Sequence, residues 1–252
     1  MAQTTQFRYS EVARVAPTPK RVRARVGGAF VADSKNAILV YNQHFPFAYA
    51  FPKEDTRADL FTFGPAGGDG DSEETRRGAL KVDGRTIEGA ATLHTAGRLE
   101  DHVVLDWNKM DDWYEEDEPV FVHPHDPGHR IDIRQSDRHV VIEIDGTTVA
   151  DSRRPVLLFE TGLPVRHYLP HTDVRLGLLR TSDKTTGCAY KGFASYHHVE
   201  VDGKRHEDIV WSYRSPFHEA LKIQGLMAFF DERIDVIVDD EEQERPDTMW
   251  NE

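Results

Sequence analysis

The tetrapeptide Val-Ala-Asp-Ser occurs twice, at 31–34 and at 149–152, and this repeat constrains the fold more than any other feature. The second copy starts 118 residues after the first, close to half of the 252-residue length. Self-similarity at a fixed offset marks repeated structural units, so the chain is predicted to hold two tandem copies of one domain. Matching residues extend without a gap around the motif: Val22 with Val140, Gly28 with Gly146, Leu39 with Leu157, Asp55 with Asp173 and Leu60 with Leu178.

The repeat divides the chain into two domains with short flanking segments. Each domain has roughly 100 residues, which is enough to bury a core of its own. The junction contains the Pro- and Gly-rich string HPHDPGHR, and the tail from Asp239 is acidic and expected to be disordered. The predicted boundaries are an N-terminal arm at 1–20, a first β domain at 21–122, a junction at 123–138, a second β domain at 139–240 and a tail at 241–252.

Both domains have the patterns of antiparallel β structure. Apolar residues alternate at Val140, Ile142 and Ile144, and Asp-Gly pairs follow at 145–146, 83–84 and 202–203 as tight turns. The repeated Asp-Ser pairs are interpreted as strand-to-turn residues whose side chains bond local backbone. The fold class is therefore mostly β, with two small antiparallel domains and little helix.

Two local patterns refine this prediction. The run GLMAFF-DER-IDVIV near the end of the second copy, with a charged turn between two apolar segments, predicts a hairpin. In the first copy, Trp107, Met110 and Tyr114 fall at helical spacing and predict a short helix.

The two copies diverge most over 182–203, which has no counterpart in copy one. The corresponding stretch of copy one, residues 60–75, is rich in Gly and acidic residues and contains no Cys, Lys or Tyr. If one copy kept a binding or chemical role, copy two is the better candidate. Its distinctive residues are Cys188, Tyr190, Lys191 and Gly192, with Trp211-Ser212-Tyr213 farther along.

These residues resemble the domain-of-unknown-function 427 family. The resemblance is carried by Val149-Ala150-Asp151-Ser152, Thr186-x-Cys188-x-Tyr190-Lys191-Gly192, Ala194-Ser195-Tyr196 and Trp211-Ser212-Tyr213-x-x-Pro216. It covers nearly all of 139–238, with a weaker copy at about 21–117, as in the tandem members of that family.

The resemblance implies a small antiparallel β domain of pseudo-barrel or β-tent type, and no established catalytic activity. A nucleotidyltransferase-like label is sometimes attached to the family, but the chain has neither a paired carboxylate motif nor a phosphate loop that supports it. The chain also departs from the family pattern. Ala189 stands where Pro commonly follows the Cys, and His197 stands where Trp commonly follows the Tyr.

Catalysis, if present, would rest on Cys188 or Lys191. Cys188 is the only thiol, and Lys191 is three residues away. A neighbouring ammonium favours the thiolate, which is the nucleophilic form. The alternative is that Cys188 packs as a small apolar side chain. No His or Asp near it in sequence completes a triad, so no catalytic residue is assigned.

A binding site in copy two is the leading hypothesis. Positive charge beside aromatic side chains would suit an anionic small molecule, since binding sites are mostly apolar with a few convergent polar groups. The alternative places Tyr190 in the core and Gly192 in a turn that needs a positive φ or a close backbone approach. The candidate binding residues are Arg175, Tyr190, Lys191, Tyr196, Trp211 and Tyr213.

The junction histidines His123, His125 and His129 form a weak candidate metal site. Alternate residues of an extended segment point to the same side, which would bring His123 and His125 together. Against this, the flanking prolines mark an exposed connector, and a structural zinc site needs a closed set of four ligands. No metal and no cofactor is predicted.

The formal charge of −13 disfavours nucleic acid and anionic membranes as partners. The chain shows neither a signal-peptide pattern nor an apolar run of membrane-spanning length, and it has one cysteine, so we expect a cytoplasmic protein. The predicted function is a module that binds a small molecule or a protein, with any pocket in the second domain. The alternative is an enzyme that acts on a small anionic metabolite through Cys188 or Lys191.

Overall fold

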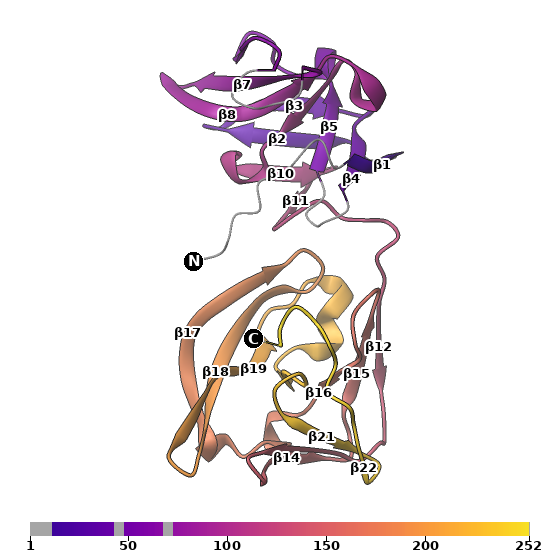
Figure 1. Ribbon diagram of the computed structural model, residues 1–252, viewed down its shortest axis with the longest axis vertical. Coiled ribbons are helices and arrows are strands. Elements are labelled where there is room, and N and C mark those ends of the chain that lie inside the picture. Colours follow the sequence, from indigo (N-terminus) through magenta and orange to yellow (C-terminus); the bar gives the residue numbers. More distant parts are fainter. Residues whose placement is uncertain (1–11, 43–47, 68–72, 252) are drawn as a thin grey trace. The chain divides into compact units, whose positions relative to one another are not determined.

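The computed structural model describes residues 12–42, 48–67 and 73–251. The chain divides into two compact units, residues 1–126 and 127–252 (Figure 1). The division falls inside the Pro- and Gly-rich junction. Residues 1–11 of the expected N-terminal arm lie outside the described part.

Both units are built almost entirely from strands, as predicted. The strands of the first unit are β1 (Val12–Pro17), β2 (Val22–Val26), β3 (Ala29–Ser34), β4 (Ile38–Asn42), β5 (Ala48–Pro52), β6 (Phe61–Phe63), β7 (Thr75–Val82), β8 (Arg85–His94), β9 (His102–Leu105), β10 (Asp112–Glu115) and β11 (Glu118–Val120). Its short 3-10 helices are η2 (Lys53–Asp55), η4 (Gly97–Leu99) and η5 (Trp107–Lys109).

The second unit repeats the order of the first. Its strands are β12 (Ile131–Gln135), β13 (Val140–Ile144), β14 (Thr147–Ser152), β15 (Val156–Glu160), β16 (Arg166–Tyr168), β17 (Leu179–Cys188), β18 (Gly192–Val201), β19 (Lys204–Tyr213), β20 (Met227–Phe229), β21 (Asp235–Val238) and β22 (Glu241–Glu242). Its 3-10 helices are η6 (His171–Asp173), η7 (Leu176–Leu178) and η8 (His218–Ile223). No helix in the described residues of either unit is long and apolar enough to cross a membrane.

The sheet topology confirms the tandem repeat. In the first unit the sheets run β1-β4-β5-β9-β8-β7-β6 and β11-β10-β2-β3. The second unit has the equivalent order in three sheets, β12-β15-β16, β17-β18-β19-β20 and β14-β13-β21-β22. The β5–β9 pairing of the first unit is reduced in the second to a bridge between Leu169 and Met227. The named strands pair antiparallel throughout, and the sheets formed by the described residues stay open.

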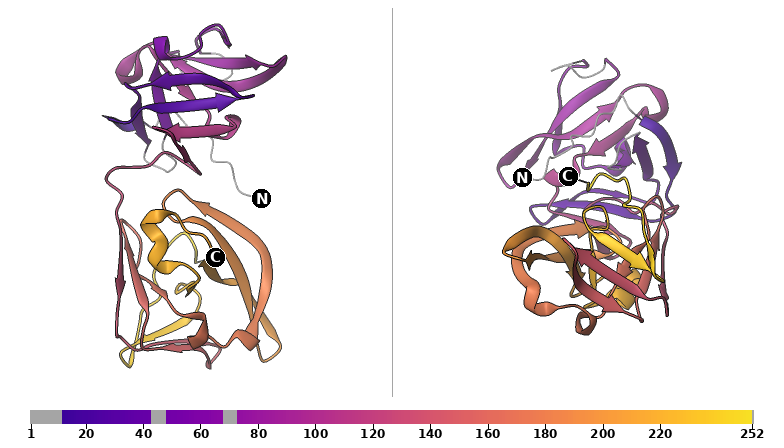
Figure 2. Two further views of the ribbon diagram at one scale, coloured as in Figure 1. Left: turned by 180° about the vertical axis from the view of Figure 1, so that it is seen from behind. Right: turned by 60° about the horizontal axis from the view of Figure 1, so that its bottom comes forward.

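The core of the second unit lies between two walls of strands. Figures 1 and 2 show the long strands β17, β18 and β19 on one side and β12 and β15 on the other. Leu158 and Tyr168 come from the β15 side, while Trp211 and Phe229 come from β19 and β20, and all four are buried in one cluster. The first unit buries a separate core of its own.

The predicted tight turns are confirmed by their backbone angles. Asp145 and Gly146 both have positive φ, 49° and 75°, and the pair Gly27-Gly28 takes the same place in copy one with 57° and 77°. Two successive positive φ values are the mark of the hairpin turn that matches strand twist. Asx-Gly and Gly-Gly pairs favour it because Gly has no Cβ to clash.

The serines of the repeated motif have an architectural role in both units. Ser34 Oγ donates to Asp55 Oδ2 at 2.6 Å and accepts from the backbone N–H of Asn36. Ser152 Oγ donates to Asp173 Oδ2 at 2.7 Å and accepts from the backbone N–H of Arg154. The bond to the local backbone confirms the expectation. The bond to the aspartate was not expected, and it joins the end of β3 to η2 in the first unit and the end of β14 to η6 in the second.

The aspartates of the motif differ from the expectation. Asp33 accepts from Arg21 Nε at 2.6 Å, and Asp151 pairs with His139 Nε2 at 2.8 Å. Each partner lies immediately before the adjacent strand, so these carboxylates bond across the sheet instead of to local backbone.

Three further expectations differ from the structure. The short helix expected over 107–114 is present only as the single turn η5, and strand β10 follows because Trp113 and Glu115 pair with β2 and are buried there. The two strands of the expected hairpin near 226–238 belong to different sheets, since β20 pairs with β19 and β21 with β13. Residues 12–17, expected in a polar arm, form β1 on the edge of the first sheet.

The acidic tail is also ordered rather than disordered over its described part. β22 pairs with β21, Arg245 bonds Asp235 at 2.6 Å, and Thr248 Oγ1 donates to Glu232 at 2.7 Å. The tail returns along the second unit (Figure 1). These contacts order the segment, although its acidic composition predicts disorder.

Candidate functional site

The hairpin between β17 and β18 presents the residues that distinguish copy two. Cys188 ends β17 opposite Gly192, which begins β18, and Tyr190 and Lys191 lie in the turn between them. Gly192 has a φ of 98°, and an added Cβ would meet backbone atoms of Ser215 and Phe217 at 3.4 Å. The predicted positive φ is confirmed, whereas the added Cβ would be in ordinary van der Waals contact with this backbone.

Lys191 forms an ion pair in the interior instead of presenting free charge. Its Nζ donates to Glu160 Oε2, and the two side chains are only 11% and 5% exposed. His129 Nε2 lies 3.0 Å from the other carboxylate oxygen, and its ring stacks on Tyr190 with centroids 4.2 Å apart. A buried carboxylate needs such partners because burial removes its hydration. The Lys191 charge is therefore compensated by Glu160.

The Cys188 thiol is half-buried and has no hydrogen bond to any described residue. Burial raises the pKa of Tyr168, and the negative charges of Glu160 and Cys188 raise it further. Burial likewise raises the pKa of Tyr213. The structure thus leaves the thiol without a described base bonded to it.

The other aromatic candidates are core residues with hydrogen-bonded polar atoms. Trp211 Nε1 donates to Tyr168 Oη at 3.1 Å, and Tyr196 Oη lies 2.7 Å from Thr186 Oγ1. Arg175 lies elsewhere, where Nη1 donates to the backbone carbonyl of Thr148 at 3.0 Å. No contact between described residues joins Arg175 to the Lys191 cluster.

The junction histidines are divided between the two units. In the first unit, His123 Nδ1 lies 2.7 Å from the backbone carbonyl of Pro124, and His125 Nδ1 lies 3.7 Å from Glu115 Oε2. His129 belongs to the second unit and pairs with Glu160. The described residues contain no group of three or more His, Cys, Asp or Glu side chains placed to hold a metal.

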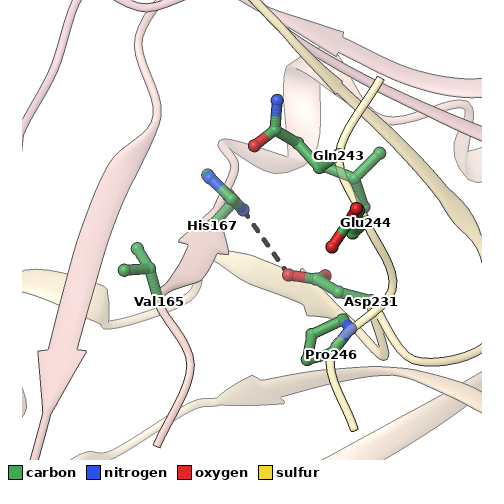
Figure 3. A pocket seen from close by; sticks show the side chains of 7 residues that line it. Val165, His167, Asp231, Gln243, Glu244 and Pro246 are labelled. Atoms are coloured by element: carbon green, nitrogen blue, oxygen red, sulfur yellow. Dashed lines mark ion pairs between the residues drawn. The ribbon is translucent and has the colours of Figure 1, made fainter. Parts of the chain in front are cut away.

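A pocket of about 140 Å³ opens in the second unit at a place that the sequence did not indicate. Figure 3 shows His167 and Asp231 pointing toward one another across it, with Glu244 beside Asp231. The pocket lies between β16, the turn before β21 and the returning C-terminal segment. It is lined by Val165, His167, Asp231, Val236, Gln243, Glu244 and Pro246.

Two facing polar groups of the pocket have no hydrogen bond within the described structure. The Asp231 side chain is only 9% exposed, and its nearest charged nitrogens are His167 Nδ1 at 3.6 Å and Arg166 Nη1 at 3.9 Å. Both distances exceed hydrogen-bond length. His167 Nδ1 is itself fully buried and has no hydrogen bond, only this ion pair with Asp231. Buried polar atoms are nearly always bonded, so this pair calls for a physical explanation.

Successive side chains around β16 point alternately to the pocket and to the core. Val165 and His167 face the pocket, whereas Arg166 and Tyr168 face the interior. Arg166 donates to both oxygens of Glu232, at 2.9 and 2.5 Å, and Glu232 is fully buried. The Arg166 guanidinium also lies over the rings of Trp211 and Trp250. This neighbouring cation is therefore already engaged.

Charged residues inside apolar runs were the available sequence signal for this site. The strings VRHYL and FFDERID place Arg166, His167, Asp231 and Glu232 among strand-forming residues. The second string was assigned to an exposed hairpin turn, so its charges were not treated as buried.

Comparison with known proteins gives a family and no named relative. Residues 14–116 and 132–240 each match the family described as Domain of unknown function (DUF427). No curated protein is similar enough to count as a match. Because the two matched segments make up most of the chain, this protein belongs to the DUF427 family as a member with two copies in tandem.

Proposed function

We propose that the second unit is a binding module for a small molecule, and that the ligand occupies the pocket lined by His167 and Asp231. The observation that carries this proposal is the largely buried Asp231 side chain, which lines a pocket and has no hydrogen bond to a described residue. A ligand donor that bonds Asp231 would remove the cost of leaving this carboxylate unsatisfied.

The size of the pocket limits the ligand to a small group. A volume of about 140 Å³ is below the roughly 300–1,000 Å³ of sites for drug-sized molecules. It is close to the volume of about 150 Å³ at which an engineered cavity takes up a benzene molecule. The ligand, or the part of it that enters, is therefore about one six-membered ring.

The rival proposal is an enzyme that acts through Cys188 or Lys191. The geometry favours the binding module because the Lys191 ammonium is bonded to Glu160, and no described base contacts the Cys188 thiol. A Cys188→Ser variant separates the two. Binding in the pocket is expected to be unchanged, since the pocket lining does not include Cys188.

A fragment screen by methyl NMR tests the binding module directly. Ring fragments of about six heavy atoms are titrated into the full chain, and the methyl signals of Val165 and Val236 report on the pocket walls. We expect hits that shift these two valines and leave the core residue Val201 unchanged. Hits are expected to vanish in Val165→Phe, which fills the pocket, and to persist in Val141→Phe, a strand valine outside it.

The proposal is contradicted if no fragment moves the Val165 and Val236 signals. It is equally contradicted if Val165→Phe binds the same fragments as the wild-type protein. Native mass spectrometry before and after denaturation adds a second readout, because a resident ligand would appear as a mass that denaturation releases.

We also propose a cytoplasmic location. The half-buried free thiol of Cys188, with no second cysteine to pair with it, suits a reducing compartment. Fractionation of the source cells with an antibody against the chain checks this, and recovery from an oxidising compartment would contradict it.

A further inference from the structure

We propose that the pocket selects a ligand with a cationic nitrogen, an ammonium or protonated ring amine, which donates to Asp231 while Glu244 supplies a second negative charge. This inference rests on the proposed binding function and names the chemical class of its ligand. It reverses the charge expected from the sequence, where Lys191 and Arg175 suggested an anionic ligand.

The charge of the pocket lining is the first argument. Two carboxylates, Asp231 and Glu244, line it, and neither a lysine nor an arginine does. The nearest cation, Arg166, is held by both oxygens of Glu232, so the pair contributes no net charge. An anion would meet two carboxylates with no free cation to offset them, whereas a cation would be attracted by both.

The burial of Asp231 is the second argument. A carboxylate that is nine-tenths buried has lost most of its hydration, and Asp231 recovers no hydrogen bond from the described protein. Hydrogen bonds between ionised groups are the strongest available compensation. A donor that carries positive charge therefore gains more at Asp231 than a neutral donor does.

The geometry of the imidazole is the third argument. His167 Nδ1 lies 3.6 Å from Asp231 Oδ2, which is too long for a direct hydrogen bond. Figure 3 shows the imidazole facing the carboxylate across this long ion pair. The imidazole therefore leaves Asp231 without a direct hydrogen bond, and the carboxylate stays able to accept one from a donor in the pocket.

The remaining walls suit the hydrocarbon part of an amine. Val165, Val236 and Pro246 are apolar, and the Gln243 side chain adds one neutral polar group. Small-molecule sites commonly combine apolar walls with a few polar groups that fix orientation. A saturated ring amine matches this lining in size and polarity.

The test compares three probes of similar size that differ in charge. Piperidine, protonated at neutral pH, is the cation; tetrahydropyran is its neutral ring counterpart; pivalate is the anion. Each is titrated into the full chain, and dissociation constants are taken from the Val165 and Val236 methyl shifts. We expect piperidinium to bind about tenfold or more tightly than tetrahydropyran, as charge-assisted hydrogen bonds require, and pivalate not to bind.

Two variants and one control complete the test. Asp231→Asn and Glu244→Gln are each expected to weaken piperidinium several-fold or more while leaving tetrahydropyran little changed. Glu244 lies on the exposed C-terminal segment, so its variant keeps the fold and tests the role of charge independently of Asp231→Asn. Glu242→Gln is the control, because it removes the same charge two residues away, outside the pocket.

The outcomes separate this inference from the proposed function. Equal or tighter binding of tetrahydropyran overturns the cationic class and leaves the binding module standing. An equal loss of piperidinium affinity in Glu242→Gln and Glu244→Gln also overturns it, since general surface charge would then explain the preference. If no probe moves the two valine signals, water satisfies the pocket acceptors and both proposals fail.

Discussion

The first unit buries the carboxylate of Glu115 and the second buries that of Asp231, but the two differ in their hydrogen bonds. Glu115 accepts from Lys20 Nζ and from Tyr49 Oη, with His125 nearby. Asp231 is buried to a similar degree, accepts no hydrogen bond from described residues and faces a pocket. The hydrogen-bonded Glu115 is expected to stabilise its unit, whereas Asp231 is the carboxylate that the proposed ligand would bond.

The largest expected effect is a loss of stability when the buried ion pair Arg166–Glu232 beside the pocket is broken. Arg166→Met leaves the fully buried Glu232 without its cation, which should lower the free energy of unfolding by about 3–5 kcal/mol. Urea unfolding followed by amide signals of the second unit measures it. Adding Glu232→Gln to Arg166→Met should recover much of the loss. A loss below about 1 kcal/mol would show that Glu232 does not need Arg166.

The next effect is the pH dependence of the first unit. Burial raises the pKa of Glu115, but the interactions with His125, Lys20 and Tyr49 outweigh it and lower the pKa to about 2. Because the folded pKa lies below the unfolded value, this stabilisation is fully present above about pH 4.5 and is lost as pH falls toward 2.

The shift corresponds to about 3 kcal/mol of unfolding free energy for the first unit. Urea unfolding at pH 5 and pH 2.5, followed by amide signals of the first unit, measures most of it. Tyr49→Phe removes one of the lowering hydrogen bonds and should shrink the difference between the two pH values. An unchanged difference would mean that the Tyr49 hydrogen bond does not stabilise the ionised form of Glu115.

The smallest effect concerns the repeated serine. Ser34→Ala and Ser152→Ala each remove a hydrogen bond to an aspartate and one to a backbone N–H, and each should cost about 1 kcal/mol in its own unit. Equal losses, seen by amide exchange in each unit, would show that this part of the motif is architecture common to both copies. A loss confined to Ser152 would instead tie the motif to a role of the second unit.

The features that sequence predicted are those that depend on local residues or on the repeat itself. The offset of 118 residues predicted two equivalent β units, and Asp145-Gly146 predicted its turn because turn geometry is decided by adjacent residues. The conformation of Gly192 was likewise predicted from its place in a turn. These inferences need no knowledge of distant strands.

The candidate site depends on contacts between distant segments, and sequence did not predict it. Val165 and His167, Asp231, and Glu244 come from three separate stretches. Similarly, the partner of Lys191 is Glu160, 31 residues away. The run 226–238 was misread as a hairpin because the pairing of β20 with β19 and of β21 with β13 is non-local.

The most direct measurement compares Glu115→Gln with Asp231→Asn by urea unfolding at neutral pH, each followed in its own unit. Both replace a buried carboxylate with a neutral amide of the same shape. Glu115→Gln should destabilise the first unit by about 2 kcal/mol or more, because charge-assisted hydrogen bonds are lost. Asp231→Asn should leave the second unit unchanged within about 0.5 kcal/mol, or more stable, because no hydrogen bond is lost. If Asp231→Asn destabilises its unit as much as Glu115→Gln does, Asp231 is a structural residue and the contrast between the two units is wrong.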